Sequence, residues 1–501
     1  MVPILQSSLL TALVQTPTGM KNKIDDFEKF RYNKINDFAR FSDNKTNDFA
    51  VFFPGGESDM FKRKIYDKIL EWKMESDGRT ALLIEGPRRV GKSTIVKNFA
   101  ENEYESHIIV DFYKASNETK ALFDDLSDLN YIFLQLQLTY RTSLTTRKSA
   151  IIFDEVQLCP KARQAIKALV EDGRYDYIET GSLISIHKNV KDILIPSEER
   201  KIKMCPMDFE EFRWALGDDF TIPMLRELYE ARKPTGQAVH RKLMRDYRLY
   251  MLVGGMPQAV ESYIEHNDFI KVDAVKRDIL TLYEDDFFKI DPTGTLSSLF
   301  DAIPAQLNSN ASRYKVSSVL SGSRANDILE EIAELRDSGT VLVSYHANDP
   351  GVGMAQNKDL TRFKLFLADT GLFVTLVFKD KSFTENDIYF NLLNGRLQTN
   401  LGYLYENMTA QTLSANGHNL YYHTFPNEAS RHNYEIDFLI ADKKKISPIE
   451  VKSSGYKNHS SLDAFSKKYA SRISKRILIY TKDYQRDEAT EYLPMYMAQF
   501  L

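Results

Sequence analysis

Apolar and polar positions form distinct blocks from residue 60 onward. Residues 61–72 carry apolar side chains at helical spacing, which predicts an amphipathic helix. Residues 81–84 and 150–153 are short, continuous apolar runs, as expected of strands that are buried on both faces. Residues 175–178 form a third run, which leads into a predicted polar turn at 179–182. This pattern predicts an α/β domain built on a parallel sheet.

The middle of the chain reads as helical, followed by a small mixed module. Residues 209–249 alternate charged and apolar side chains at helical spacing, which predicts a helical subdomain. Residues 315–320, a helix at 325–338 and a strand at 340–345 together predict a winged helix. Its helix is acidic, with Asp327, Glu330, Glu331, Glu334 and Asp337 against Arg336. DNA phosphates would repel that helix, so we interpret the module as an interdomain packing unit.

The last hundred residues combine a helix with two strands. Residues 401–413 have helical periodicity, and residues 435–440 and 446–452 read as strands joined by a turn at 441–445. Antiparallel pairing of the two strands is therefore expected.

Four charged residues of this C-terminal region form a candidate site. Alternation places Glu450 and Lys452 on one face of the second strand, and pairing can bring Asp437 beside them. Asp437 and Glu450, with Glu406 from the helix, are candidate ligands of a second divalent cation, Mg²⁺ or Mn²⁺, while Lys452 would position a water. A Glu-x-Lys pair on a strand is also compatible with a solvated ion pair. Both interpretations stay open.

The segment before residue 60 is dominated by a repeat. Three similar units begin at Asn22, Asn33 and Asn44, eleven residues apart. Eleven residues make about three helical turns, so the phenylalanines of the repeats could share one stripe of a helix. Asn and Asp do not favour helix interiors, however, so we expect residues 1–59 to be a disordered extension, with Met60 as an alternative translation start.

Composition and charge narrow the class of protein. A chain of 501 residues with 43% apolar residues can bury several cores, which excludes a fibrous or wholly disordered protein. Lys and Arg number 66 against 70 Asp and Glu, so any nucleic-acid site must be local. Cys159 and Cys205 form no C-x-x-C motif, which excludes a disulfide framework and fits a cytoplasmic protein. The apolar residues 4–14 lack a basic flank, and no membrane segment is expected.

A glycine-rich motif follows the first predicted strand directly. It has the form G-x-x-x-x-G-K-S, and its residues are Gly86, Pro87, Arg88, Arg89, Val90, Gly91, Lys92, Ser93 and then Thr94. The glycines allow backbone N–H groups to point at phosphate oxygens, and the Lys92 ammonium reaches the β- and γ-phosphates. The Ser93 hydroxyl can ligate Mg²⁺ at the start of a helix. The motif predicts a binding site for ATP and Mg²⁺.

Two carboxylates follow the second predicted strand, as ATP hydrolysis requires. Asp154 is a candidate Mg²⁺ ligand, and Glu155 is the candidate residue that orients the attacking water. Ser182 is a candidate sensor of the γ-phosphate. The Arg200 guanidinium could neutralise phosphate charge from a neighbouring segment or subunit. The alternative is that Arg200 forms a surface ion pair with Glu198 or Glu199.

Taken together, these motifs resemble the AAA-type ATPases of bacteria and archaea that carry a C-terminal domain of unknown function with a restriction-endonuclease-like core. The matching segments are residues 60–72, 86–93, 152–155, 180–182, 206–212, 254–257, 277–279, 367–372 and 449–452. The resemblance implies a P-loop ATPase core at 60–215, a helical subdomain at 216–298, a winged-helix-like module at 299–350 and a restriction-endonuclease-like domain at 351–501. The repeat has no counterpart in that pattern, and Glu199–Arg200 stands where many members have Gly-Arg.

Two functions are compatible with this organisation. The first is an ATP-hydrolysing enzyme whose C-terminal domain contacts DNA or RNA and cleaves it with a metal. The basic residues Lys467, Lys468, Arg472, Lys475 and Arg476 are the candidate backbone contacts. The second is a nucleotide-gated interaction protein whose nuclease-like domain is an inactive binding platform. A homo-oligomer is compatible with either.

Overall fold

The computed structural model describes residues 60–182, 197–309, 311–381, 384–394, 402–428, 430 and 432–501. The chain separates into two units, Met1–Pro54 and Gly55–Leu501. The repeat and the expected disorder of residues 1–59 lie outside the described residues, so these predictions stay untested. The description below concerns the second unit.

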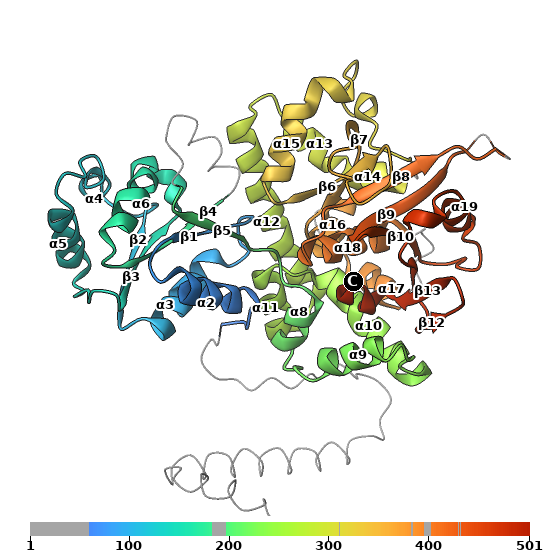
Figure 1. The fold of residues 1–501 in the computed structure, drawn as a ribbon, viewed down its shortest axis with the longest axis horizontal. Helices are drawn as coiled ribbons and strands as arrows, with labels where there is room; N and C mark the ends of the chain where they lie inside the picture. The colour runs from blue at the N-terminus through green and yellow to red at the C-terminus, as the bar shows by residue number, and fades with distance from the viewer. Residues whose placement is uncertain are drawn as a thin grey trace, which may run out of the picture. The chain divides into compact units, whose positions relative to one another are not determined.

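The first sheet contains five strands that all run parallel (Figure 1). They are β1 (Ala81–Glu85), β2 (Ser106–Asp111), β3 (Ser149–Asp154), β4 (Asp176–Gly181) and β5 (Glu199–Lys203), in the order β2-β3-β4-β1-β5. The predicted parallel sheet is confirmed. The turn predicted at 179–182 is wrong, because β4 continues through Glu179 and Thr180, which are fully buried between its neighbours β3 and β1.

Helices cover both faces of this sheet because successive strand residues point to opposite sides. Leu82 and Ile84 of β1 pack in one core with Trp72, which lies on the predicted N-terminal helix. Leu83 packs in the other core, with residues such as Phe133. The flanking helices are α2 (Ile65–Ser76), α3 (Lys92–Glu103), α4 (Asn117–Ala121), α5 (Leu129–Tyr140) and α6 (Pro160–Asp172), with the short turn η1 (Val156–Leu158) between β3 and α6.

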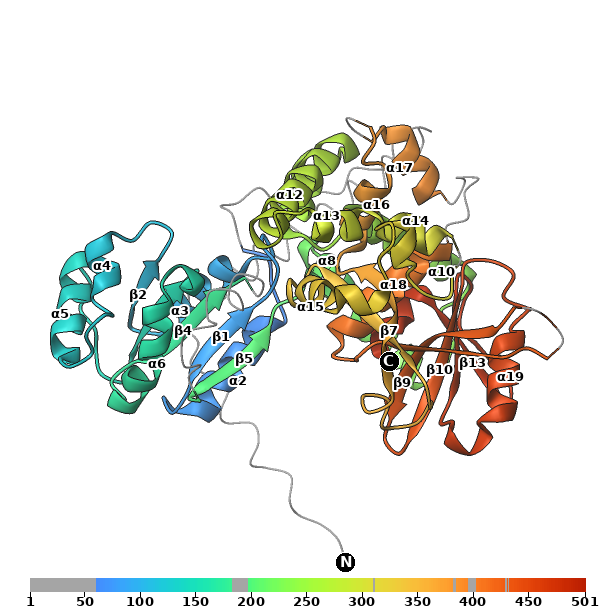
Figure 2. The same ribbon diagram turned by 90° about the horizontal axis from the view of Figure 1, so that it is seen from above.

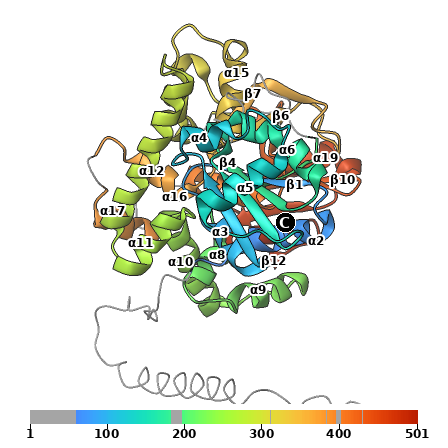
Figure 3. The same cartoon turned by 90° about the vertical axis from the view of Figure 1, so that its left-hand side faces the viewer.

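A run of helices follows the first sheet, as the periodicity predicts. These helices are α8 (Phe209–Ala215), α9 (Thr221–Glu230), α10 (Gln237–Val253), α11 (Pro257–His266), α12 (Phe269–Ile290), α13 (Thr295–Asp301) and α14 (Ile303–Asn308). Asp208 caps α8 by accepting a hydrogen bond from the Glu211 N–H, while the Glu211 side chain accepts one from the Asp208 N–H. The longest of them, α12, packs beside α11 and α16 (Thr370–Val377) (Figure 3).

The segment predicted as a winged helix contributes to the second sheet. Two short turns, η2 (Val316–Ser318) and η3 (Ala325–Ile328), precede α15 (Leu329–Asp337), so the helix predicted from 325 starts as a 3₁₀ turn. The strand β6 (Val341–Ala347) then pairs antiparallel with β7 (Lys358–Leu367). It also pairs parallel with a C-terminal strand, β8 (Tyr421–Phe425). This strand therefore joins the C-terminal sheet.

The second sheet has eight strands in the order β12-β13-β11-β10-β9-β8-β6-β7. Its remaining strands are β9 (Tyr434–Asp442), β10 (Lys445–Lys452), β11 (Arg476–Tyr480), β12 (Gln485–Arg486) and β13 (Thr490–Pro494). The predicted antiparallel pair is β9 and β10, and β10 pairs parallel with β11. The remaining helices and turns are α17 (Asn386–Leu393), α18 (Gly402–Ala415), α19 (Ser460–Lys468), η4 (Ala470–Arg472) and η5 (Met495–Phe500). Of these, α18 and α19 pack against the sheet (Figure 2).

Four segments that are distant in sequence meet at one buried point. We call it the joint, and it consists of Met207, Tyr250, Gly255, Asp369 and Gln411. The Met207 N–H donates to the Gly255 carbonyl at 2.7 Å, and the Gly255 N–H donates to Asp369 Oδ2 at 2.6 Å. The Tyr250 hydroxyl donates to the Met207 carbonyl at 2.7 Å and accepts from Gln411 Nε2 at 3.0 Å. The joint thus links β5, α10, α16 and α18.

The joint has no room for a side chain at Gly255. A Cβ there would lie 2.0 Å from the Met207 carbonyl oxygen, which is backbone and cannot swing away. Gly255→Ala should therefore lower the free energy of unfolding by about 2 kcal/mol or more, measured as a lower thermal midpoint. Gly353→Ala is the matched control, because the nearest atom to its Cβ is a Gln356 side-chain oxygen at 3.7 Å. Equal midpoints for the two variants would contradict this account of the joint.

Candidate functional site

The glycine-rich motif forms a loop between β1 and α3. Gly86 is required there, because a Cβ would lie 2.4 Å from the Met204 carbonyl oxygen. Gly91 has φ 99°, a left-handed conformation that side chains disfavour, and it directly precedes α3. Lys92, the first residue of α3, is buried and donates from Nζ to the carbonyls of Gly86 at 3.0 Å and Pro87 at 2.9 Å. The loop thus closes around its own lysine.

The environment of Lys92 weakens its positive charge. Burial lowers the pKa of the ammonium from 10.5 to about 8, although the charges of Glu155 and Asp154 act in the opposite direction. Contact with phosphate groups would favour the charged form. With a pKa of about 8 the free lysine is still mostly protonated at pH 7, and phosphate contact should keep it protonated at higher pH as well.

The Mg²⁺ and water-orienting candidates lie together at the ends of β3 and β4. Ser93 Oγ donates to Asp154 Oδ1 at 2.8 Å, and the Thr180 hydroxyl donates to the same oxygen. Thr180 Oγ1 also accepts from the Glu155 N–H at 3.2 Å. Glu155 has φ 56°, and Gln157 Nε2 donates to its carboxylate. The structure therefore brings Ser93, Asp154 and Glu155 together.

Thr180 is the member of this group that the sequence reading missed. From the sequence alone, Thr180 is expected in a turn and Ser182 is the candidate γ-phosphate sensor. Ser182 directly follows β4 and is buried, and its role stays a prediction. One feature could have pointed to Thr180. Because β3 and β4 pair in parallel, their carboxyl ends lie side by side, so a polar residue at the end of β4 lies close to Asp154 at the end of β3.

Arg200 does not face the phosphate loop of its own chain. It lies on β5 opposite Leu82, at the entry of β1, whereas the loop leaves the other end of that strand. Its guanidinium pairs with Glu75 on α2 at 2.6 Å, and both side chains are exposed. The predicted ion pair with Glu198 or Glu199 is wrong, because Arg200 pairs with Glu75 on the neighbouring helix instead. A phosphate contact from a neighbouring subunit stays a prediction.

Residues from other parts of the chain contact the remaining residues of the phosphate loop. Arg88 pairs with Asp286 of α12 at 3.1 Å, and its carbonyl accepts from the Tyr283 hydroxyl at 3.3 Å. The Val90 carbonyl accepts from the Arg63 guanidinium at 3.0 Å. Arg89 has φ 64°, and Thr94 is exposed on the first turn of α3. Helix α12 and Arg63 therefore brace the loop.

Comparison with protein families agrees with this geometry. Residues 78–213 match the family model described as an AAA domain. This part of the chain is an AAA-type P-loop ATPase domain. Its fold supports ATP binding and hydrolysis, and it implies a nucleotide bound with a divalent metal, typically Mg²⁺. Residues 244–382 and 401–497 match two further models, each described as a domain of unknown function.

Solved structures with some similarity to this chain include a Walker-type ATPase of Pyrococcus abyssi, with 15% identity over 65% of this chain and 99% of that chain, at TM-score 0.39. The RuvB Holliday junction branch migration motor of Thermotoga maritima has 13% identity over 57% and 91% of the two chains, at TM-score 0.26. The ORC1 protein of Aeropyrum pernix, solved in complex with DNA, has 12% identity over 64% and 94%, at TM-score 0.23. No curated protein matches. Across the described residues, no helix has the length and apolar character needed to span a membrane.

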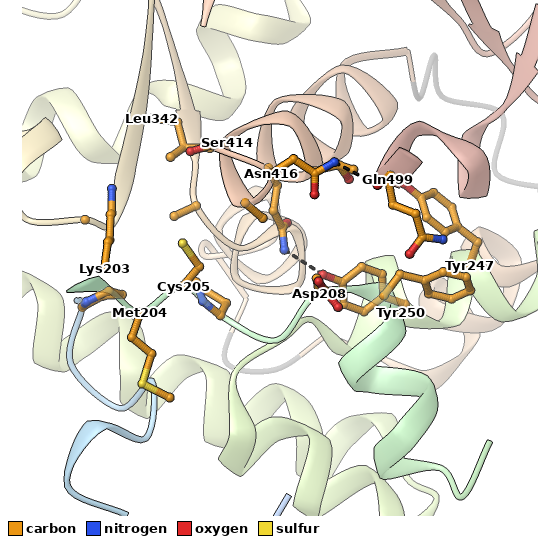
Figure 4. Close-up of a pocket in the computed structure, with 18 residues that line it drawn as sticks. Lys203, Met204, Cys205, Asp208, Tyr247, Tyr250, Leu342, Ser414, Asn416 and Gln499 are labelled. Carbon is orange, nitrogen blue, oxygen red and sulfur yellow. Dashed lines mark hydrogen bonds between the residues drawn. The ribbon is translucent and has the colours of Figure 1, made fainter. Parts of the chain in front are cut away.

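A pocket lies between the segment after β5 and helix α18 (Figure 4). Its lining is mostly apolar and includes Pro87 of the phosphate loop, Tyr250 and Gln411 of the joint, and Cys205. Burial raises the pKa of the Cys205 thiol, so this cysteine is not a reactive thiolate. The pocket therefore marks where the ATPase domain meets the C-terminal region, whereas the nucleotide position is defined by the loop.

The four C-terminal candidates also come together. Lys452 Nζ lies 2.7 Å from Glu450 Oε1, and Asp437 Oδ2 accepts from the Val451 N–H at 2.8 Å. Enclosure by protein, the nearby Glu406 carboxylate, and then Glu450 raise the pKa of Asp437 well above its usual range. The predicted proximity of Asp437 and Glu450 thus agrees with the structure.

An unpredicted lysine lies in this carboxylate cluster. Lys364 of β7 is buried, and its Nζ lies 2.8 Å from Glu406 Oε1 and 2.5 Å from Glu435 Oε1. Burial lowers the pKa of Lys364, but the attraction of these carboxylates outweighs it and raises the pKa well above the usual value. Within the described ranges, no group of three or more His, Cys, Asp or Glu residues is arranged to hold a metal. The predicted second cation site is therefore not supported.

The free Lys92 yields a test of nucleotide binding. With a pKa of about 8, Lys92 is partly neutral at pH 8, and phosphate contact should make it take up about half a proton. At pH 6.5 the lysine is already protonated, so its contribution should vanish. Calorimetric titration with Mg²⁺-loaded ATP, in buffers of different ionisation enthalpy, measures this uptake. If proton uptake on ATP binding is no larger at pH 8 than at pH 6.5, the lowered pKa of Lys92 is contradicted.

Proposed function

We propose that the ATPase domain hydrolyses ATP with Glu155 orienting the attacking water, and that this drives a restriction-endonuclease-like C-terminal domain that contacts nucleic acid. The observation that supports ATP hydrolysis is that the hydroxyl groups of Ser93 and Thr180 both donate to Asp154, close to Lys92. Lys92 leaves the loop carbonyls to bind phosphate, and Ser93 with Asp154 would hold Mg²⁺. The metal would supply charge that offsets the phosphate oxygens.

The order of elements in the C-terminal region supports the second half. Helix α18, the strands β8, β9 and β10, helix α19 and the parallel strand β11 follow one another. Glu406 lies on the helix, Asp437 on β9, and Glu450 and Lys452 on β10. This is the order of acidic and lysine positions expected for a domain of the restriction-endonuclease type.

The joint supports coupling between the two parts. Met207 follows β5 after a short segment that includes Met204, whose carbonyl oxygen lies against Gly86 of the phosphate loop. Gln411 lies on α18, the helix that carries Glu406. Helix α12 forms a second connection, because it contacts the loop through Tyr283 and packs against α16. A nucleotide-dependent shift of the loop would therefore reach α18 through packed backbone.

An inactive, nucleotide-gated binding platform is the second candidate function. It is favoured by one observation, the buried Lys364 between Glu406 and Glu435. This lysine provides the positive charge that a metal would otherwise bring.

Hydrolysis is tested by two substitutions in the ATPase domain. Glu155→Gln should keep ATP binding but slow turnover about 100-fold or more, because the water loses its orienting carboxylate. Lys92→Ala should weaken ATP binding about tenfold or more, because a charged phosphate contact is lost. Steady-state turnover and equilibrium nucleotide binding measure the two effects.

A matched control is Glu171→Gln, which makes the same chemical change at an exposed residue of α6. It should leave both quantities unchanged. Wild-type turnover in both the Glu155 and the Lys92 variants would refute the assigned roles.

Nucleic-acid binding is tested at the exposed lysines that flank η4. Lys467 and Lys475 are exposed, whereas Arg472 and Arg476 already pair with Asp349 and Asp463. The Lys467→Ala, Lys475→Ala double variant should bind DNA and RNA oligonucleotides more weakly, with a salt dependence of log K smaller by about 2. Fluorescence anisotropy over a salt titration measures both values.

The control is the Lys97→Ala, Lys167→Ala double variant, which removes two exposed lysines from the ATPase domain. Its binding should match the wild type. Equal loss in both double variants would point to non-specific charge, and no binding by the wild type would remove nucleic acid from the proposal.

A further inference from the structure

The C-terminal cluster brings four carboxylates together, of which Glu450 is buried and the other three are partly buried. Glu406, Glu435, Asp437 and Glu450 come from α18, β9 and β10. Like charges at this proximity repel strongly in a protein interior, so a counter-charge must be present. In a metal-dependent nuclease a divalent cation supplies it. Here two ammonium groups are available, Lys452 beside Glu450 and Lys364 beside Glu406 and Glu435.

Lys364 reaches the cluster from a neighbouring part of the sheet. It lies on the edge strand β7, in register with Ser344 of β6. Its side chain is only 7% exposed and ends between Glu406 and Glu435, at 2.8 and 2.5 Å. A lysine enclosed in this way loses its hydration and is retained only because the carboxylates pair with it. The position of Lys364 is therefore determined by the carboxylates.

One oxygen of each carboxylate in the cluster already has a partner within the protein. Glu406 Oε1 pairs with Lys364, Glu450 Oε1 pairs with Lys452, and Asp437 Oδ2 accepts the Val451 N–H. Glu450 Oε2 is buried without a hydrogen-bond partner. A divalent cation shared by these carboxylates would have to compete with those partners, and among the described residues no group of three or more His, Cys, Asp or Glu is arranged to hold a metal. The residues as arranged do not fit a divalent metal.

We propose that Lys364 is the resident counter-cation of this cluster, so that the C-terminal region keeps its fold and its ligand binding without a divalent metal. The proposal rests on the restriction-endonuclease-like fold of the proposed function and decides between its two candidates in favour of the binding platform. It concerns charge compensation by this chain's own residues, and no cleavage step is assigned.

The test measures how Mn²⁺ changes the thermal midpoint of the full chain without nucleotide. The wild type and an Asp437→Asn, Glu450→Gln variant should show the same small shift, because neither binds metal in the cluster. Lys364→Met removes the charge but keeps an unbranched side chain, so its midpoint should fall. Millimolar Mn²⁺ should then raise that midpoint by about 2 °C or more, because the uncompensated carboxylates recruit the ion by mass action.

Two controls assign that shift. Lys364→Arg keeps a positive charge and should gain no Mn²⁺ response, and adding Glu406→Gln and Glu435→Gln to Lys364→Met should abolish the gained response, because these are the carboxylates that Lys364 contacts. The proposal is overturned if the wild type shows a Mn²⁺ shift that the Asp437→Asn, Glu450→Gln variant lacks. It is also overturned if folded Lys364→Met gains no response.

If Lys364→Met does not fold, comparing the Mn²⁺ shifts of the wild type and the Asp437→Asn, Glu450→Gln variant still decides whether the wild-type cluster binds a metal. ATP turnover and oligonucleotide binding are measured on the same samples. A wild type that neither hydrolyses ATP nor binds an oligonucleotide refutes the proposed function, while the Mn²⁺ result still decides the role of Lys364.

Discussion

The hydrogen bonds made by the Asp369 carboxylate are the constraint on which the arrangement of this chain depends. The carboxylate is buried and accepts N–H groups of Gly255 at 2.6 Å and Leu372 at 2.8 Å. Burial raises the pKa of Asp369, while these hydrogen bonds and the nearby Lys276 act in the opposite direction. A buried carboxylate without partners costs several kcal/mol, so the contacts form together or not at all. One side chain thus fixes the start of α16 and the path between α10 and α11.

This constraint also explains why distant motifs belong together. Residues 206–212, 254–257 and 367–372 read as separate signatures along the chain, yet Met207, Gly255 and Asp369 form consecutive contacts in the joint. Lys276 of α12 extends the network, because its Nζ donates to the carbonyls of Leu252 at 2.7 Å and Gly371 at 3.2 Å. Glycine at 255 is therefore a packing requirement, imposed by a backbone approach that no side chain can share.

The sequence was sufficient for features that depend on local spacing and insufficient for those that depend on long-range contacts. The loop around Lys92, the parallel sheet and the pairing of β9 with β10 follow from short motifs and alternation. Thr180 was missed because its partner, Asp154, is 26 residues away and the end of β4 cannot be located from periodicity alone. Lys364 was missed because it meets Glu406 only through the sheet that β7 joins. A charged residue within an alternating strand was its only local signal.

Two buried lysines show how the sites differ. Lys92 contacts only backbone carbonyls, and burial lowers its pKa to about 8, so its site gains charge when phosphate arrives. Lys364 contacts two carboxylates, which raise its pKa, so its charge is already compensated. Phosphate binding would therefore change the charge of the first site, whereas the ion pairs of Lys364 already compensate the second. Any signal between them must therefore travel through packing, along the loop, Met207 and the joint to α18.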